Sequence, residues 1–243
     1  MNPTALITGA SKRIGKAISE HLAANGWNVI IHFNRSAEEA IELVQELGDN
    51  YPTQLFSSVT ANLSNNHEVE SLIPNIVAKS GPFDLLVNNA SVFDKSYLRE
   101  TSERLYDSQM NVNLKAPFFL TRDFSVYCKK GNIINFVDTR ITGNTSNFAA
   151  YTLSKKALWE LTKMAALEFA PEIRVNAIAP GVTLAPADED ENYLQNLAKS
   201  IPMKQPGGVD PILKSIDFIL ENNHLTGQLL FADGGENLGK NIE

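Results

Sequence analysis

Short, continuously apolar runs alternate with segments of helical periodicity along this chain, and that alternation restricts the fold more than any other feature. The first run covers residues 5–8, and Ile14, Ile18 and Leu22 then recur at the spacing of one helix face. Strands that are apolar throughout are buried on both faces, as in a parallel sheet with helices on either side. We therefore expect an α/β fold, a single doubly wound, Rossmann-like domain over residues 1–243.

The sheet is expected to have seven parallel strands, at residues 5–8, 29–33, 54–59, 84–88, 132–137, 174–178 and 228–232. A long helix is expected from about Ala149 to Phe169, and the last helix begins at Asp210. The segment at about 182–205 is the expected substrate loop. Its acidic run, residues 188–191, is interpreted as a solvated helix start, or alternatively as a flap over a site.

Composition excludes several classes of protein. Hydrophobic residues are 43% and charged residues 20% of the 243, a balance typical of a soluble globular enzyme rather than a disordered, collagen-like or coiled-coil chain. The formal net charge of −7 repels phosphate backbones and anionic lipid. Neither nucleic acid nor a membrane surface is therefore expected as a partner.

The cysteine and histidine content indicates a metal-free protein of a reducing compartment. The one cysteine, Cys128, cannot form an internal disulfide, and no pair among the four histidines has metal-ligand spacing. The first residues lack the basic and apolar regions of a signal peptide, and no apolar run is long enough to span a bilayer. We expect a cytoplasmic location.

The turn after the first expected strand, residues 8–15, reads Thr-Gly-Ala-Ser-Lys-Arg-Ile-Gly. A glycine-bearing turn that leads from a strand into a helix can present backbone N–H groups to a pyrophosphate. Such a turn also occurs where the backbone alone needs glycine. Arg13 stands where a nucleotide-binding turn more often has glycine, so its guanidinium is expected to face the phosphates or the substrate.

The second expected strand is followed by Asn34, Arg35 and Ser36. In a dinucleotide fold this point meets the adenosine ribose, where an acidic residue binds the 2′-hydroxyl and an arginine accepts a 2′-phosphate. The absence of an acid and the presence of Arg35 favour NADPH over NADH. Ser36 and Glu39 also form a capping-box pattern, and capping and phosphate binding can coexist.

Tyr151 and Lys155 are four residues apart and so share one face of the long helix. A lysine near a phenol is expected to lower the pKa of the tyrosine toward the range of a general acid. Asp138 follows the fifth strand, at the sheet edge where doubly wound folds place their sites; the alternative is a strand-end turn residue. Asn113 could anchor a water molecule or kink its helix.

Taken together, these features resemble the short-chain dehydrogenase/reductase family over the whole chain. The resemblance rests on the turn at 8–15, Asn88-Asn89-Ala90, Asn113, the Tyr151-x-x-x-Lys155 pair and Pro180-Gly181. It implies hydride transfer to or from a nicotinamide, with Tyr151 as proton donor and Lys155 binding the ribose. Asn113 would serve a proton relay. Most members have serine where this chain has Asp138, thirteen residues before Tyr151.

The pteridine reductase branch of the family has an aspartate at that position, an arginine in the glycine turn and Arg-Ser after the second strand. This chain is similar at each point. The resemblance implies that Phe93 stacks on a pterin, although Phe93 could instead pack under a loop. The residues expected to contact substrate are Arg13, Ser91, Phe93, Asp138 and Tyr151, and the catalytic set is Asp138, Tyr151, Lys155 and Asn113.

Residues and resemblance together predict a cofactor site for NADPH. It comprises Gly9, Ser11, Arg13, Ile14, Gly15, Asn34, Arg35, Ser36, Asn62, Leu63, Asn89, Ala90, Ser91, Tyr151, Lys155, Pro180 and Gly181. Asn62 departs from the family, which usually has aspartate there for the adenine, but an amide can still pair with the base edge.

The expected function is an NADPH-dependent pteridine reductase that converts a dihydropterin, such as dihydrobiopterin, dihydromonapterin or dihydrofolate, to the tetrahydro form. Two alternatives stay open: a 3-oxoacyl-carrier-protein reductase or other short-chain carbonyl reductase, and a catalytically silent NADP-sensing protein. The joint presence of Asn113, Tyr151 and Lys155 argues against the silent protein. The family resemblance also implies a homotetramer.

Overall fold

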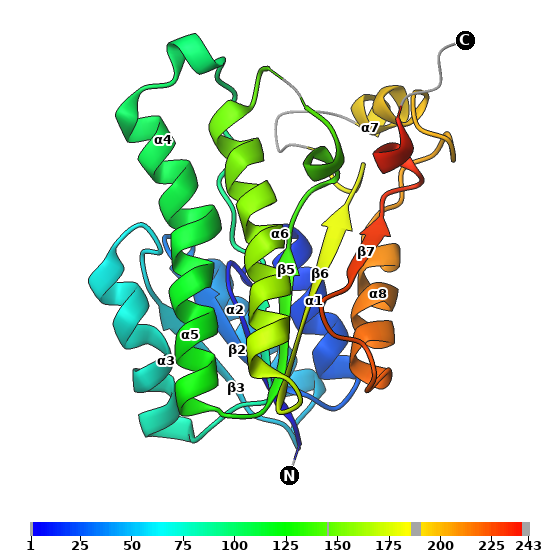
Figure 1. Ribbon diagram of the computed structural model, residues 1–243. Coiled ribbons are helices and arrows are strands. Elements are labelled where there is room, and N and C mark those ends of the chain that lie inside the picture. The colour runs from blue at the N-terminus through cyan, green and yellow to red at the C-terminus, as the bar shows by residue number, and fades with distance from the viewer. Residues whose placement is uncertain (1, 145, 186–190, 240–243) are drawn as a thin grey trace.

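The computed structural model describes residues 2–144, 146–185 and 191–239. Its centre is a seven-stranded sheet of order β3-β2-β1-β4-β5-β6-β7, and every pairing is parallel (Figure 1). This sheet confirms the predicted doubly wound α/β fold. The strands are β1 (Thr4–Ile7), β2 (Asn28–Phe33), β3 (Phe56–Thr60), β4 (Leu85–Asn88), β5 (Gly131–Phe136), β6 (Ile173–Pro180) and β7 (Leu229–Ala232).

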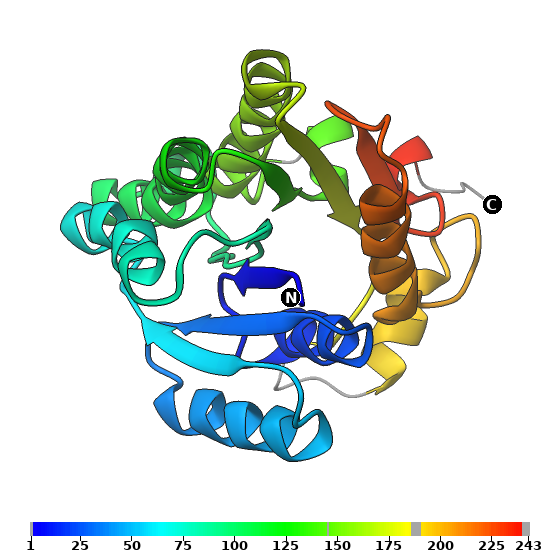
Figure 2. The ribbon, with the colours of Figure 1, turned by 90° about the horizontal axis from the view of Figure 1, so that it is seen from below.

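Helices cover both faces of the sheet (Figure 2). One face carries α1 (Arg13–Ala24), α2 (Ala37–Asn50) and α8 (Asp210–Glu221), and the other carries α3 (Asn66–Ser80), α5 (Ala116–Tyr127) and α6 (Ala149–Phe169). α4 (Glu103–Met110) packs on α6, and α7 (Glu191–Ala198) lies at the upper edge of the molecule in Figure 1. Short 3-10 turns are η1 (Leu98–Glu100), η3 (Thr139–Thr142) and η4 (Glu236–Leu238).

Alternate residues of one strand enter different cores, which explains why the central strands are largely apolar. Leu6 of β1 packs with α3 and α5, whereas Ala5 and Ile7 pack with α1, α2 and α8. All three side chains are fully buried. A polar residue at any of them would lose contact with water on either face of the sheet.

The chain reverses its direction of progress across the sheet between β1 and β4, which lie side by side in the order above. A crevice forms outside the carboxyl ends of the strands at such a switch point, and ligands of doubly wound folds bind there. The segments after β1, β2, β4, β5 and β6 all begin at that edge, the upper one in Figure 1.

Two predictions fall partly on residues that the structure does not describe. Residues 186–190 of the expected substrate loop lie outside the described ranges, and with them most of the acidic run; α7 begins at Glu191.

Among the helices that are described, none has the length and apolar character needed to cross a membrane.

Candidate active site

The glycine turn after β1 is held in place by side chains from two neighbouring strands. Gly9 adopts a φ of +61°, and its N–H donates to Nδ1 of His32, on β2, at 3.1 Å. Asn89, after β4, donates from Nδ2 to the carbonyls of Thr8 and Gly9 at 2.9 and 3.1 Å. A Cβ at Gly15 would lie 2.1 Å from the Gly9 carbonyl oxygen, so only glycine allows this close approach.

Arg13 occupies the left-handed region at φ +54° and connects this turn to the segment after β6. Its two terminal nitrogens donate to the carbonyls of Ala185 and Leu184 at 2.8 and 3.3 Å. The side chain is exposed at the mouth of the crevice. The guanidinium therefore lies between the expected phosphate site and the expected substrate loop.

The α1 and α2 N-termini at the crevice are not capped by their own side chains. Ser36 is the N-cap residue of α2 but makes no capping hydrogen bond, and Lys12 makes none on α1. The predicted capping box is wrong, because Glu39 pairs instead with Lys12 at 2.6 Å. By contrast, Asn65 caps α3 with its side chain. The first N–H groups of α1 and α2 can donate hydrogen bonds to phosphate oxygens, and exposed Arg35 lies beside them, an arrangement that fits NADPH.

The remaining predicted cofactor residues frame the crevice. Asn34 and Asn62 are exposed, and Oδ1 of Asn62 accepts the N–H of Ser64 at 3.0 Å. Leu63 is buried in the core beside α3, so only its backbone can reach a ligand. A Cβ at Gly181 would lie 2.6 Å from the Asp233 Cα, which explains the glycine after β6. Ser11 and Ala90 lie in the turns after β1 and β4, Ile14 lies in the first turn of α1, and Pro180 ends β6.

Tyr151 and Asp138 form the central contact of the candidate site. The Tyr151 hydroxyl donates to Oδ2 of Asp138 at 2.7 Å. Asp138 ends the extended segment after β5, where Oδ1 accepts the N–H of Arg140 at 2.8 Å. Lys155 lies one turn along α6 from Tyr151, but its Nζ donates to the Phe136 carbonyl at 2.7 Å. Its Nζ is 5.8 Å from the centre of the Tyr151 ring.

The electrostatics of Tyr151 differ from the prediction. Burial raises the pKa of Tyr151 well above its ordinary value, and the carboxylate of Asp138 raises it further. Burial also lowers the pKa of Lys155 to about 8, against an opposing effect of Asp138. The prediction that Lys155 lowers the tyrosine pKa is therefore wrong for this arrangement, because the nearest charge to the phenol is an anion. Tyr151 holds its proton firmly and shares it with Asp138.

Asn113 lies in η2, a π-helical turn (Asn111–Lys115) between α4 and α5. Its Oδ1 accepts from the Val92 N–H and the Ser91 hydroxyl at 2.9 and 3.1 Å. Its Nδ2 donates to the Val92 carbonyl, at 2.9 Å, and to Gln109 and Ser154. The side chain is fully buried and ties the loop after β4 to α6. π-Helical turns often occur at functional sites.

Phe93 forms an aromatic wall beside Tyr151. The two rings meet edge to face with centroids 4.6 Å apart, and half of the Phe93 side chain is exposed. Phe148, the residue before α6, stacks on Phe93 at 4.4 Å and an angle of 10°. Ser96 pairs with Phe148 in an isolated parallel bridge, which brings the two loops together. Phe93 thus packs against the site and is open to a flat ligand.

Three residues of the site were not expected from the sequence: Phe148, Arg140 and Glu236. Burial raises the pKa of Glu236, on η4, as does the charge of nearby Asp138. Phe148 precedes Tyr151 by three residues, a spacing that could have indicated a shared helix face. For Arg140 and Glu236 the sequence carries no comparable pattern.

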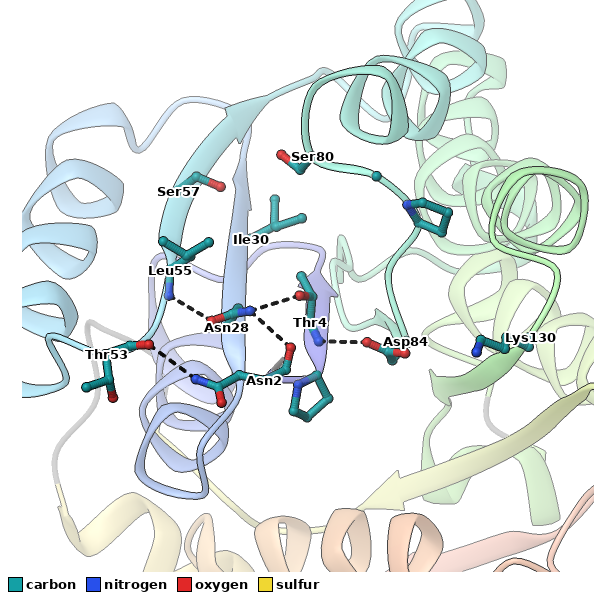
Figure 3. A pocket seen from close by; sticks show the side chains of 13 residues that line it. Asn2, Thr4, Asn28, Ile30, Thr53, Leu55, Ser57, Ser80, Asp84 and Lys130 are labelled. Atoms are coloured by element: carbon teal, nitrogen blue, oxygen red, sulfur yellow. Dashed lines mark hydrogen bonds between the residues drawn. The ribbon is translucent and has the colours of Figure 1, made fainter.

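A hollow of about 710 Å³ lies at the opposite edge of the sheet (Figure 3). Its polar groups largely bond one another: Asn28 donates to Thr4 and accepts from the Leu55 N–H, and Asp84 accepts the Thr4 N–H. No predicted site residue lines it. No cluster of three metal-ligating side chains occurs within the described ranges either. The crevice at the carboxyl ends remains the candidate reaction site.

Comparison with known proteins gives matches over nearly the whole chain. The family described as short chain dehydrogenase matches residues 3–195. The 3-oxoacyl-[acyl-carrier-protein] reductase FabG of Staphylococcus epidermidis is 31% identical over 97% of this chain and 99% of that protein. Pteridine reductase 1 of Leishmania tarentolae is 30% identical, over 97% of this chain and 96% of that protein.

Solved structures also match this chain over nearly its whole length. FolM alternative dihydrofolate reductase 1 from Brucella canis, complexed with NADP, has a TM-score of 0.90 and 35% sequence identity. The similarity covers 98% of this chain and 95% of that one. A blue fluorescent protein from a metagenomic library, in complex with NADPH, has a TM-score of 0.88 and 28% identity, covering 96% of this chain and 97% of that one.

Proposed function

The chain belongs to the short-chain dehydrogenase family, and we propose that it is an NADPH-dependent pteridine reductase. It is an oxidoreductase of that family, and its cofactor is the phosphorylated nicotinamide dinucleotide. The FolM structures of Brucella canis and Brucella suis, both in complex with NADP, support the cofactor. Uncapped α2 and the adjacent Arg35 support it from the chain's own residues.

The observation that carries the substrate class is the Asp138–Tyr151 hydrogen bond beside the Phe93 ring. A pterin is flat, aromatic and rich in ring nitrogens. It needs a stacking surface and a group that exchanges protons with nitrogen, and Phe93 and the Tyr151–Asp138 pair supply these. A serine in place of Asp138 would instead donate a hydrogen bond to a carbonyl oxygen.

The reaction divides between cofactor and protein. When bound, NADPH supplies a hydride to a carbon of the pterin ring. Tyr151 holds at its hydroxyl oxygen the proton that the adjacent ring nitrogen takes up, and Asp138 shares that proton across 2.7 Å. Lys155, fully buried against the Phe136 carbonyl, orients the cofactor ribose. Asn113 fixes the loop that carries Ser91 and Phe93.

The FabG relatives favour a second candidate, a 3-oxoacyl-carrier-protein reductase. Steady-state NADPH consumption should be measured with dihydrobiopterin, dihydrofolate, biopterin and an acetoacetyl thioester. We expect turnover of dihydropterins, little turnover of the thioester, and inhibition by flat diaminopteridines. Robust reduction of the thioester with none of any pterin would reject the pteridine reductase and favour the acyl-carrier enzyme.

We propose further that the outer faces of α5 and α6 are covered by a second copy of the chain, within a homotetramer. Large apolar side chains there are 48–87% exposed: Phe118, Val126, Leu153, Met164 and Leu167. A shallow hollow of about 260 Å³ runs between the two helices. Exposed apolar side chains gathered on two neighbouring helices favour an interface. Sedimentation velocity should give the mass of four chains, and a single-chain mass would reject the assembly.

A further inference from the structure

Arg140, the second residue of η3, contacts both the proton-bearing pair and the aromatic wall. Its backbone N–H donates to Oδ1 of Asp138 at 2.8 Å, and its Nη1 lies 3.4 and 3.3 Å from Oδ1 and Oδ2. Its guanidinium carbon is 5.1 Å from the centre of the Phe93 ring and 5.0 Å from that of Phe148. Tyr151 likewise contacts both Asp138 and Phe93.

We propose that Arg140 is a positioning residue that holds the Asp138 carboxylate toward the Tyr151 hydroxyl and fixes the Phe93 ring beside it. The proposal rests on the proposed function, because it assigns to Asp138 and Phe93 the roles given above. Arg140 acts through Asp138 and Phe93, and no contact with the substrate is assigned to it.

The contacts restrict the guanidinium in three directions. Asp138 binds its edge, while Phe93 and Phe148 lie within cation–π distance of its charge. Phe148 in turn packs parallel to Phe93, so the Phe93 ring is held from one side by a ring and from another by a cation. A planar cation suits this arrangement better than an ammonium, because it can satisfy a carboxylate while resting on aromatic surface.

The charge of Arg140 also affects the proton-bearing groups. Burial and Asp138 raise the pKa of Tyr151, and Arg140 opposes them. The same holds for Glu236, whose pKa is raised by burial and by Asp138 and lowered by Arg140. Loss of the cation should therefore raise the pKa of both groups. Besides Arg140, the charged groups that interact with Tyr151, Lys155 or Glu236 are Asp138, after β5, and Asp233, after β7.

The test compares Arg140→Gln and Arg140→Lys with a matched control. Lys163 on α6 likewise bonds a carboxylate, Glu160 at 2.7 Å, and lies 5.2 Å from the centre of the Trp159 ring, away from the crevice. Lys163→Gln therefore removes the same kinds of contact without touching the site. For each protein, NADPH affinity is measured by fluorescence titration, and kcat, KM and the pH profile of kcat by NADPH consumption.

We expect Arg140→Gln to lower kcat roughly ten- to a hundredfold, as small misplacements of reacting groups do, and to raise the KM of the pterin. The alkaline limb of the kcat profile should move to higher pH, while NADPH affinity stays within about twofold of the unchanged enzyme. Arg140→Lys keeps the charge, so it should restore the position of the pH profile and part of kcat. Because it is the milder change, it carries the test if Arg140→Gln does not fold.

A double-mutant cycle shows whether Arg140 acts through Asp138. In an Asp138→Asn enzyme, the further change Arg140→Gln should alter kcat by less than about twofold, since the carboxylate it positions is gone. If the two substitutions lowered kcat independently, so that their factors multiplied in the double mutant, the proposal would be overturned. So would an Arg140→Gln enzyme whose kcat and pH profile match those of Lys163→Gln.

The wild-type assay separates this proposal from the proposed function. If the wild type reduces no dihydropterin but does reduce the thioester, the pteridine reductase is rejected. The same variants are then measured with the thioester, because proton transfer from Tyr151 would serve that reaction too. A shifted profile and a vanishing effect in the Asp138→Asn background would still support the positioning role of Arg140 there, and their absence would overturn it.

Discussion

His32 accepts the N–H of Gly9 at Nδ1, 3.1 Å away, while its Nε2 lies 3.1 Å from the Ala61 carbonyl. A backbone N–H can only donate and a carbonyl can only accept, so the imidazole is neutral with its hydrogen on Nε2. The ring is buried, and burial lowers the pKa of His32 to about 4. One neutral side chain thus joins the cofactor turn after β1 to the end of β3.

This pairing predicts how stability depends on pH. The unfolded chain takes up a proton at His32 below about pH 6.5, whereas the folded protein does so only near pH 4. The free energy of unfolding should therefore be complete above pH 6.5 and fall by about 3 kcal/mol as pH drops from 6.5 to 4. Urea unfolding at several pH values measures this. His32→Gln should flatten the dependence, and exposed His67→Gln should not.

Tyr151→Phe keeps the ring against Phe93 and removes only the hydroxyl that bonds Asp138. We expect unchanged folding and NADPH affinity, with kcat lowered by a factor on the order of a hundred or more, the usual contribution of a general acid. Single-turnover kinetics measures the chemical step. A near-native rate would mean that Asp138 or water donates the proton.

Lys155→Met should affect stability and activity in opposite directions. Burial of the charged amine is unfavourable, as its lowered pKa of about 8 indicates, so an apolar side chain should keep or raise the melting temperature. The same change removes the amine from the site, and both kcat and NADPH affinity should fall. Lys156→Met, at the neighbouring partly exposed position, is the control and should alter neither. A clearly less stable Lys155→Met protein would contradict this account.

Arg35→Asp should weaken NADPH binding roughly ten- to a hundredfold, because a charge-assisted contact contributes about 1.5–3 kcal/mol. NADH binding should be spared or improved. Isothermal titration with both cofactors measures the difference. Arg104→Asp makes the same charge change on the exposed side of α4 and should leave both affinities alone. Unchanged NADPH affinity in Arg35→Asp would place the 2′-phosphate elsewhere.

Phe93→Ala should chiefly raise the KM of the pterin, since lost stacking costs about 1–3 kcal/mol by analogy with base–aromatic contacts. Steady-state kinetics with dihydrobiopterin gives the ratio. Exposed Leu98→Ala, on η1 of the same loop, serves as the control. If KM stays constant, Phe93 packs under the loop without serving the substrate.

Most of the fold could be predicted because the central strands are largely apolar, and Ala5, Leu6 and Ile7 of β1 alternate between two cores. The Tyr151–Asp138 contact could also be predicted, because Asp138 follows the end of β5 and Tyr151 lies in the first turn of α6, at the same edge of the sheet. The direction of the Tyr151 pKa shift could not be predicted. Lys155 donates to the Phe136 carbonyl, a backbone partner that no side-chain spacing indicates.

Other features depend on loops meeting in space. Phe148 and Arg140 reach Phe93 because the segment before α6 pairs with the loop after β4 at Ser96, a long-range contact with no local pattern. Glu236 comes from the far end of the chain. The π-helical turn at Asn113 joins what the sequence presents as two separate helical stretches, and nothing in their periodicity marks it.

The positive φ of Arg13 has a consequence for directed evolution. An arginine held in the left-handed region costs roughly 1–3 kcal/mol that a glycine would not, apart from the greater freedom of glycine in the unfolded chain. Libraries randomised at this codon and sorted for heat resistance alone should therefore enrich glycine. Sorting the same libraries for turnover should return arginine, so the two screens would diverge at a single position.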